Sequence, residues 1–204
     1  MFRAVQLFFF FLSLFLLMSI TVHAGDPADL IKQTVNDVIE ILKNEKLKKP
    51  EKMTERRVEL RRVVSEAFDF EEMSKRALAL HWKKRTLEER QKFIPLFSDL
   101  LERSYVKKIE SYTDEQILYT DENIDGDYAV VKTKIITKKN FEIPIDYRLF
   151  KKNDQWGVYD VVIEGVSLVN NYRTQFNRII RKDSYEDLVK RMEHKQKEEF
   201  EEKM

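Results

Sequence analysis

The chain has 204 residues, with 37 Lys+Arg against 36 Asp+Glu, and it contains no cysteine. The lack of cysteine excludes disulfides, Cys-ligated zinc, iron–sulfur clusters and thiol nucleophiles. The balanced charge argues against a nucleic-acid-binding protein, whose affinity depends on an excess of Lys and Arg facing phosphates. The four glycines are too few and too scattered to build a phosphate-binding or dinucleotide-binding loop.

The first 24 residues differ from the rest of the chain, because 18 of them are apolar and Arg3 carries their only charge. A short positive start, an apolar stretch from Ala4 to Ile20 and the small-x-small pattern Val22-His23-Ala24 are typical of a secretory signal peptide. We expect cleavage after Ala24 and a periplasmic location. A retained membrane anchor is the alternative, since about 17 to 20 apolar residues can span a bilayer.

From Asp26 to about residue 111, apolar residues recur at spacings of three and four, which predicts helices. Thr86-Leu87-Glu88-Glu89 has the form of a capping box and opens the longest helix. Pro95 lies inside this helix, so we expect a kink or a break there. The expected helices cover approximately residues 26–42, 54–67, 71–81 and 86–111.

From Gln116 the apolar period changes to two, which predicts strands. Turns at Asp125-Gly126 and around Asn153-Asp154 join the strands into two antiparallel hairpins. Two helices follow, and the last is rich in Glu and Lys at a spacing of four. Helices followed by consecutive strands indicate an α+β fold with a four-stranded antiparallel sheet. The expected strands cover residues 117–124, 128–138, 143–149 and 156–163, and the last two helices cover 168–181 and 184–204.

Ser167 is a candidate catalytic serine, because it lies at a strand-to-helix turn in Gly165-Val166-Ser167-Leu168-Val169. The second glycine of the hydrolase motif is absent, and His81 is the one histidine placed to act as a base. A helix N-cap is the alternative role for Ser167. Widely separated histidines and surface carboxylates give no metal-ligand cluster, so we expect neither a catalytic nor a metal site.

The run from Glu164 to Arg173, EGVSLVNNYR, followed by Gln175-Phe176, resembles the signature of the MlaC family of periplasmic phospholipid-binding proteins, also called toluene-tolerance type. Phe68-Asp69-Phe70-Glu71-Glu72-Met73 and Trp82 fit the same family. The resemblance implies a twisted antiparallel sheet wrapped by helices, with a buried lipid slot. It assigns residues 25–192 to the phospholipid-binding domain and leaves 193–204 as a charged tail of unassigned role.

The resemblance further implies a soluble monomer without a cofactor that holds a glycerophospholipid by its acyl chains. It would carry the lipid between an outer-membrane lipoprotein complex and the inner-membrane MCE-domain protein of an ABC transporter, and so maintain outer-membrane lipid asymmetry. No nucleic acid and no metal is expected as a partner. An extracytoplasmic serine hydrolase and an adaptor protein that uses its charged C-terminal helix remain the alternatives.

We expect the slot to be lined by bulky side chains on the buried faces of helices and strands, because concave apolar sites hold apolar ligands. A solidly packed aromatic core is the alternative for the same residues. Arg173 is expected to have a structural role or to lie near the head group, with a salt bridge to Glu164 as the structural option. The expected lining residues are Trp82, Phe97, Leu101, Tyr105, Tyr147, Leu149, Val161 and Ile163.

Overall fold

The computed structural model describes residues 25–201, with side chains up to residue 196; the expected signal peptide and its cleavage site after Ala24 lie outside this part. No helix within the described residues is long and apolar enough to cross a membrane. The helices are α2 (Pro27–Lys43), α3 (Met53–Ala67), α4 (Phe70–Leu78), α5 (Leu87–Glu110), α6 (Leu168–Lys182) and α7 (Tyr185–Glu201), with 3-10 turns η1 (Pro50–Lys52) and η2 (Ala79–Lys84).

The expected α+β class is confirmed, with one open antiparallel sheet whose strands follow one another in chain order. The sheet has five strands, one more than predicted. After β4 the chain turns at Glu164-Gly165, where φ is +50° and +80°, and Val166-Ser167 pairs with the end of β4. Two residues are too few to produce a periodic signal in the sequence. The strands are β1 (Gln116–Asp125), β2 (Tyr128–Ile136), β3 (Glu142–Lys152), β4 (Gln155–Ile163) and β5 (Val166–Ser167).

The capping box at the start of α5 forms as predicted. The Glu89 backbone N–H donates to the Thr86 hydroxyl at 3.2 Å, and the Thr86 N–H donates to the Glu89 carboxylate at 2.7 Å. Of the kink or break expected at Pro95, the break does not occur, because α5 continues to Glu110; the kink stays a prediction. Pro95 itself is exposed, whereas Phe93 and Phe97 on the same helix are buried. Packing of that face outweighs one lost backbone hydrogen bond.

Two other predicted boundaries need correction. The short helix ends at Leu78 and not at His81, because Ala79 has a φ of +49° and the chain continues as the 3-10 turn η2. Strand β2 ends at Ile136 and not at Lys138, because the next residues form the β2–β3 turn. At the C-terminus α7 continues to Glu201, past the proposed domain boundary, while its described buried positions end at Met192.

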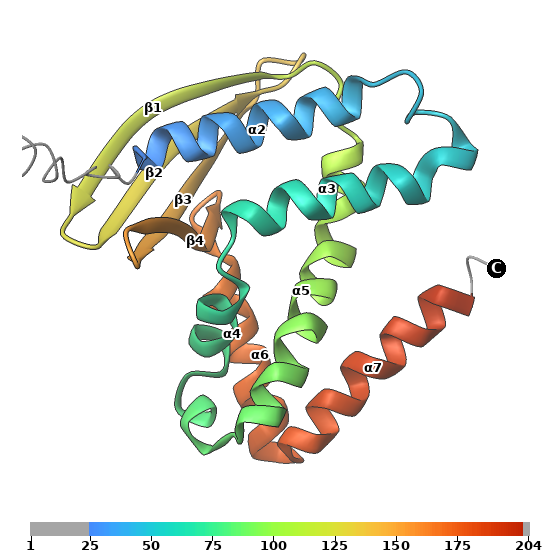
Figure 1. Ribbon diagram of the computed structural model, residues 1–204, viewed down its shortest axis with the longest axis vertical. Coiled ribbons are helices and arrows are strands. Elements are labelled where there is room, and N and C mark those ends of the chain that lie inside the picture. The colour runs from blue at the N-terminus through green and yellow to red at the C-terminus, as the bar shows by residue number, and fades with distance from the viewer. Residues whose placement is uncertain (1–24, 202–204) are drawn as a thin grey trace, which may run out of the picture.

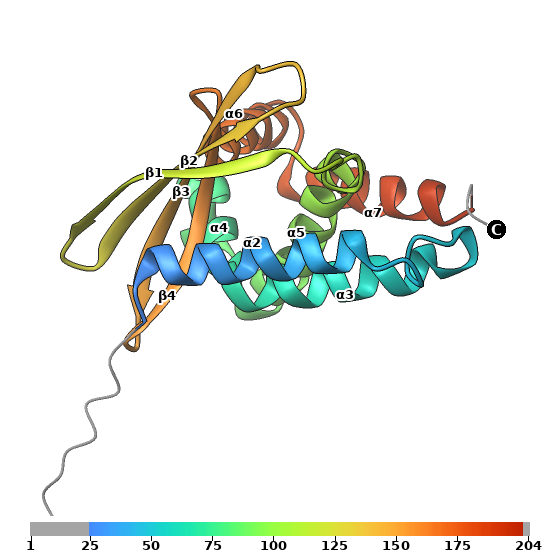
Figure 2. The same ribbon diagram turned by 90° about the horizontal axis from the view of Figure 1, so that it is seen from above.

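The sheet arches over α2, whose N-terminal half lies against the concave face and whose C-terminal half extends beyond it beside α3 (Figures 1 and 2). We call this concave face the inner face. Helices α4 and α6 contact β4, and α5 runs from the end of the sheet down to α7 (Figure 1). Asp69 joins the layers: its N–H donates to the Val158 carbonyl at 3.0 Å, and its side chain caps α4. A Cβ at Gly157 would lie 3.1 Å from that of Asp69, which explains the glycine.

Most of the buried apolar residues form two clusters, and Phe68 packs against both of them. The first, which we call the helical core, is built by η2 and by α4, α5, α6 and α7 and is rich in aromatic rings. The second, the sheet cluster, lies between α2 and strands β2, β3 and β4. The buried members of the helical core are Met73, Ala77, Leu78, Trp82, Phe93, Leu96, Phe97, Leu101, Val169, Tyr172, Phe176, Tyr185, Leu188, Val189 and Met192; those of the sheet cluster are Ile31, Ala129, Val131, Leu149, Val158 and Val161.

Candidate functional site

The register of the strands sorts the inner face into rows of side chains that run across the sheet. Residues directly opposite one another in neighbouring strands point to the same face. The first row, nearest the β3–β4 turn, is completely covered across β2, β3 and β4. There it consists of Ala129, Leu149 and Val158, and α2 packs on it through Ile31, whereas Ile124 of β1, opposite Ala129, is exposed.

Coverage decreases towards the opposite end of the sheet, where the β2–β3 turn lies. The second row has two half-buried members, Tyr147 and the charged Glu122, and the later rows are mostly half-buried, although most of their side chains are large and apolar. Inward-facing apolar side chains that keep accessible surface border a space that the protein does not fill. The second row is Glu122, Val131, Tyr147 and Val161; the third is Tyr119, Thr133, Ile145 and Ile163; the fourth is Ile117, Ile135 and Ile143.

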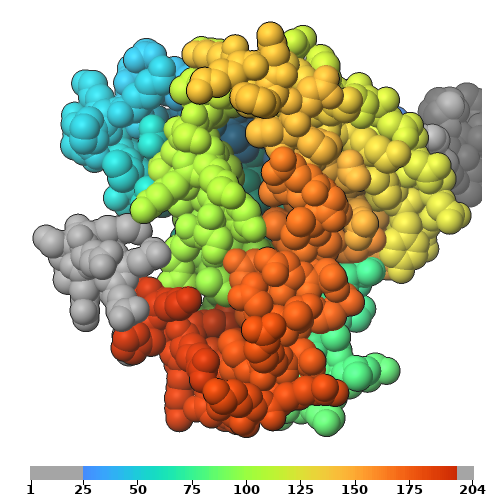
Figure 3. Space-filling view, turned by 180° about the vertical axis from the view of Figure 1, so that it is seen from behind, coloured from blue at the N-terminus to red at the C-terminus, as the bar shows by residue number. Residues whose placement is uncertain are grey.

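Figure 3 shows this space as a hollow that opens on the back of the molecule. Helix α5 forms one border, the β2–β3 turn and the end of β4 form the others, and α2 is visible at its floor (Figure 3). Past Val35, which contacts the sheet cluster, Val38 and Ile41 of α2 are half-buried. The same open end is therefore bordered by incompletely covered apolar residues of both the sheet and α2.

The tyrosines near the hollow are uncharged at neutral pH. Burial raises the pKa of Tyr147 to about 12, with a smaller contribution from Tyr119 that outweighs an opposing hydrogen bond with Thr133. Burial also raises the pKa of Tyr119 and, away from the inner face, that of Tyr105, which packs against the helical core. The phenol groups thus add hydrogen-bonding capacity without charge, which is compatible with a mostly apolar ligand.

Charged side chains connect α3 to α5 in the wall that lies opposite the sheet. Glu110 on α5 accepts hydrogen bonds from Arg56 and Arg57 of α3, each with an N–O distance of 2.9 Å, and Arg61 pairs with Glu102 at 2.6 Å. These ion pairs connect the α2–α3 hairpin to α5. The position of one wall of the hollow therefore depends on arginine–carboxylate pairs as well as on apolar packing.

The eight residues expected to line a slot fall into two groups. Tyr147, Leu149, Val161 and Ile163 lie on the inner face, but Leu149 belongs to the completely covered part of the first row. Trp82, Phe97 and Leu101 are buried in the helical core, with Tyr105 packed against it.

Phe97 shows how tightly the helical core is filled. Its ring centroid lies 5.9 Å from that of Phe93, 5.3 Å from that of Tyr172 and 5.4 Å from that of Phe176. Such stacked and edge-to-face pairs are typical of a packed interior. The alternative of an aromatic core therefore describes the surroundings of Phe97 better than a slot does.

Several residues of the incompletely covered rows were not among the expected lining set. The alternation of Ile143, Ile145, Tyr147 and Leu149 places them on one face of β3, but alternation does not reveal which end of the face α2 leaves open. The register and the length of α2 decide this. The additional residues are Ile117, Tyr119, Ile135, Ile143 and Ile145.

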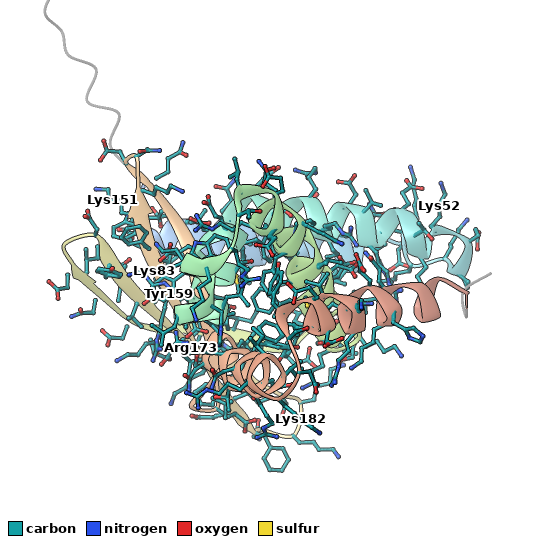
Figure 4. The ribbon with its side chains drawn as sticks, turned by 90° about the horizontal axis from the view of Figure 1, so that it is seen from below. Lys52, Lys83, Lys151, Tyr159, Arg173 and Lys182 are labelled. Carbon is teal, nitrogen blue, oxygen red and sulfur yellow. The ribbon has the colours of Figure 1, made fainter. Side chains whose placement is uncertain are left out.

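Arg173 contacts α4. Its Nε donates to the Arg76 carbonyl oxygen at 2.9 Å, and the guanidinium of Arg76 stacks on Tyr159 at 3.8 Å. Arg173 and Tyr159 lie beside α4 on the same side of the molecule (Figure 4). The salt bridge to Glu164, the structural option for this residue, does not form: within the described residues the Arg173 side chain donates to a backbone carbonyl at the end of a helix, where a cation is favourable.

Ser167 and His81 are held by different partners. The Ser167 hydroxyl donates to buried Asp160 at 2.7 Å and accepts from the Asn170 N–H at 3.0 Å, so it caps α6. The Nε2 of His81 lies 3.0 Å from the Asn177 side-chain oxygen. The N-cap role considered for Ser167 is confirmed, and the geometry gives no nucleophile–base pair.

The fold and the hollow define an α+β protein in which helices wrap one curved antiparallel sheet and leave an apolar space at one end of its concave face. A family model described as MlaC protein matches residues 32–194. The chain therefore belongs to the MlaC family.

Individual relatives agree with this assignment. The intermembrane phospholipid transport system binding protein MlaC of Haemophilus influenzae is 27% identical over 58% of this chain and 58% of its own length. Toluene tolerance protein ttg2D of Pseudomonas putida is 24% identical over 77% of this chain and 74% of its own. The chain thus spans little more than half of the Haemophilus protein. A phospholipid-binding protein from Ralstonia solanacearum, solved in complex with a phospholipid, has the same fold, with a TM-score of 0.73 and 23% identity over 83% of this chain and 96% of its own.

Proposed function

We propose that the protein is a periplasmic phospholipid carrier that holds the acyl chains of one glycerophospholipid in the hollow. In this proposal, residues 1–24 are a signal peptide removed after Ala24 and residues 25–192 form the binding domain. The carrier receives and delivers its lipid at an outer-membrane lipoprotein complex and at the inner-membrane MCE-domain protein of an ABC transporter. The half-buried apolar rows of the inner face, together with membership of the MlaC family, support this function.

The energetics of the cargo explain why such a carrier encloses the chains. Exposing one methylene to water costs about 0.8 kcal/mol. Moving a lipid through water without a carrier therefore costs on the order of 10 kcal/mol for each acyl chain of about 15 methylenes. A protein that replaces water around the tails removes this barrier without chemistry or an energy source of its own. Direction then comes from the complexes to which the carrier delivers.

Native mass spectrometry of the purified protein tests the proposal directly. We expect adducts with the masses of phospholipids, confirmed by lipid extraction and identification. Protein that is free of lipid after purification, and that takes up none when phospholipid is supplied in detergent, would refute the carrier function.

A variant that fills the hollow tests where the lipid lies. Ile163 is half-buried and in the third row, so Ile163→Trp adds a large side chain where space is available. We expect lipid occupancy to fall several-fold while the protein still unfolds cooperatively. Leu149 is a poorer choice, because a Trp there would disturb its contacts with α2.

Val58→Trp is the matched control, since Val58 is exposed on α3. It adds the same side chain outside the hollow and should leave occupancy unchanged. Equal occupancy in wild type and Ile163→Trp would place the lipid elsewhere.

A further inference from the structure

The β2–β3 turn presents an aromatic side chain to solvent at the open end of the hollow. Phe141 is 67% exposed, although a phenylalanine ring is costly to leave in water. The turn is held by three hydrogen bonds: the Asn140 N–H donates to the Thr137 carbonyl at 2.8 Å, the Thr137 N–H to the Phe141 carbonyl at 3.0 Å, and the Phe141 N–H to the Thr137 hydroxyl at 3.1 Å. The ring is therefore presented by a fixed turn.

Phe141 also continues the apolar track of β3. Residues 143, 145, 147 and 149 alternate with outward-facing positions, so they follow one face of β3, and Phe141 precedes the strand at the same spacing of two. Their exposure falls along the track: Phe141 is exposed, Ile143 and Ile145 are half-buried, and Leu149 is completely buried. An apolar path thus connects the tip of the turn with the interior, and the turn borders the hollow (Figure 3).

The charges around Phe141 are mixed, because two lysines precede it and the exposed Glu142 follows it. Lys138 and Lys139 are exposed, and neither forms an ion pair within 4 Å of a carboxylate in the described part of the chain. The nearby acids make their direct contacts elsewhere: Asp114 pairs with Lys43 at 2.7 Å, Glu142 with Lys134 at 2.8 Å, and Glu115 accepts a hydrogen bond from the Thr113 hydroxyl, although the charge of Lys138 contributes to lowering the pKa of Asp114 and Glu115. The turn therefore combines one apolar ring with two cations available for an anionic partner.

We propose that the β2–β3 turn is a membrane-contacting finger that brings the mouth of the hollow onto an anionic lipid surface. Phe141 enters the interfacial region of the bilayer, where aromatic rings are favoured, and the two lysines bind lipid phosphates. A stable protein–protein interface buries about 800 Å² on each partner, which one ring and a two-lysine turn do not supply. Short-lived contact with a membrane needs less buried area. Such contact places the mouth of the hollow where acyl chains can enter.

A second tip provides a matched control. Leu80, in η2, is 81% exposed and is followed closely by Lys83 and Lys84, which are exposed as well. This tip has nearly the same chemistry, but it lies at the end of the molecule opposite the sheet (Figure 1), and Figure 4 views the molecule from that end. If any exposed apolar side chain next to lysines were enough for membrane contact, Leu80 would contribute to vesicle binding as much as Phe141.

The test uses purified, delipidated full-length protein after signal removal, and vesicles of phosphatidylethanolamine and phosphatidylglycerol in a 3:1 ratio. Flotation measures vesicle binding, and a pyrene-labelled phospholipid in the vesicles reports the initial rate of transfer to the protein. We expect Phe141→Ser to lower both by about tenfold, equivalent to about 1.4 kcal/mol, and Leu80→Ser to change neither by more than about twofold. Lys138→Glu with Lys139→Glu should remove the preference over phosphatidylcholine vesicles.

Wild-type values for Phe141→Ser, or an equal loss in Leu80→Ser, would overturn the proposal. So would a Phe141→Ser variant that binds vesicles normally but loses affinity for a protein component of the membrane complexes. The inference rests on the proposed carrier function, but the two can fail separately. Flotation reports docking even if no lipid is transferred, whereas uptake of lipid from detergent reports the hollow even if docking is absent.

Discussion

The ion pairs between α3 and α5 predict a specific loss of stability in Glu110→Gln. The Glu110 side chain is 12% exposed, and its partners Arg56 and Arg57 are 14% and 19% exposed. The substitution keeps the shape of the side chain but removes its charge. Two largely buried guanidinium groups would then lose the charge of the Glu110 carboxylate.

The expected magnitude follows from this partial burial. Removing one partner of a fully buried ion pair costs about 3–5 kcal/mol. Because all three side chains retain some contact with solvent, we expect a decrease in the free energy of unfolding of about 2–3 kcal/mol. For a domain of this size, each kcal/mol lowers Tm by about 2–4 °C, so the melting temperature should fall by about 4–12 °C.

The effect should depend on pH in a defined direction. Burial alone would raise the pKa of Glu110, but hydrogen bonds from Arg57 and Arg56 and their positive charges outweigh it and lower that pKa. A carboxyl group whose pKa is lowered on folding contributes stability above its unfolded pKa, about 4.3, and this stability is lost as the pH falls through the folded value. The difference between wild type and variant should therefore be full at pH 7 and shrink below about pH 4.

Thermal unfolding followed by circular dichroism measures both effects. Glu102→Gln is the control, because Glu102 pairs with Arg61, which is 56% exposed; we expect it to cost less than about 1 kcal/mol. Equal decreases in Tm for the two variants, or a change of under about 1 °C for Glu110→Gln, would refute the reasoning.

Two further substitutions test the interior. Phe97 is completely buried among aromatic rings, so Phe97→Ala should lower the free energy of unfolding in urea by about 3–5 kcal/mol; a loss below about 1 kcal/mol would contradict tight packing. The pKa of Tyr147 is raised to about 12, so its contribution to stability should be lost as the pH rises from about 10 through 12. Stability should fall less steeply above pH 10 in Tyr147→Phe, and parallel curves for variant and wild type would count against that shift.

Local signals predicted most of the elements. The capping box at Thr86 and Glu89, the turn at Asp125-Gly126 and the N-cap role of Ser167 depend on contacts within a few residues, and all three form in the structure. Strand β5 and the end of the short helix at Leu78 did not follow from sequence patterns. The former is only two residues long, and the latter depends on a positive φ at Ala79, a residue that rarely adopts one.

The site could be predicted only in part, for a geometric reason. The sequence identifies apolar faces, and the alternation in β3 correctly places Tyr147 and Leu149 on one face. It does not say where a covering helix stops. Leu149 is covered by α2 whereas Ile143 is not fully covered, and the difference is set by the position of α2 over the sheet. For the same reason, the sequence did not separate Phe97 in the helical core from residues beside the hollow.

The separation of the helical core from the inner face has a consequence for how such a protein can change over time. Most aromatic anchors that hold α4, α5, α6 and α7 together lie outside the incompletely covered rows. Mutations at Ile135, Ile143 or Ile163 can alter the width of the hollow while leaving the helical core intact. Substitutions that alter the hollow can therefore be selected without loss of the packing in the helical core.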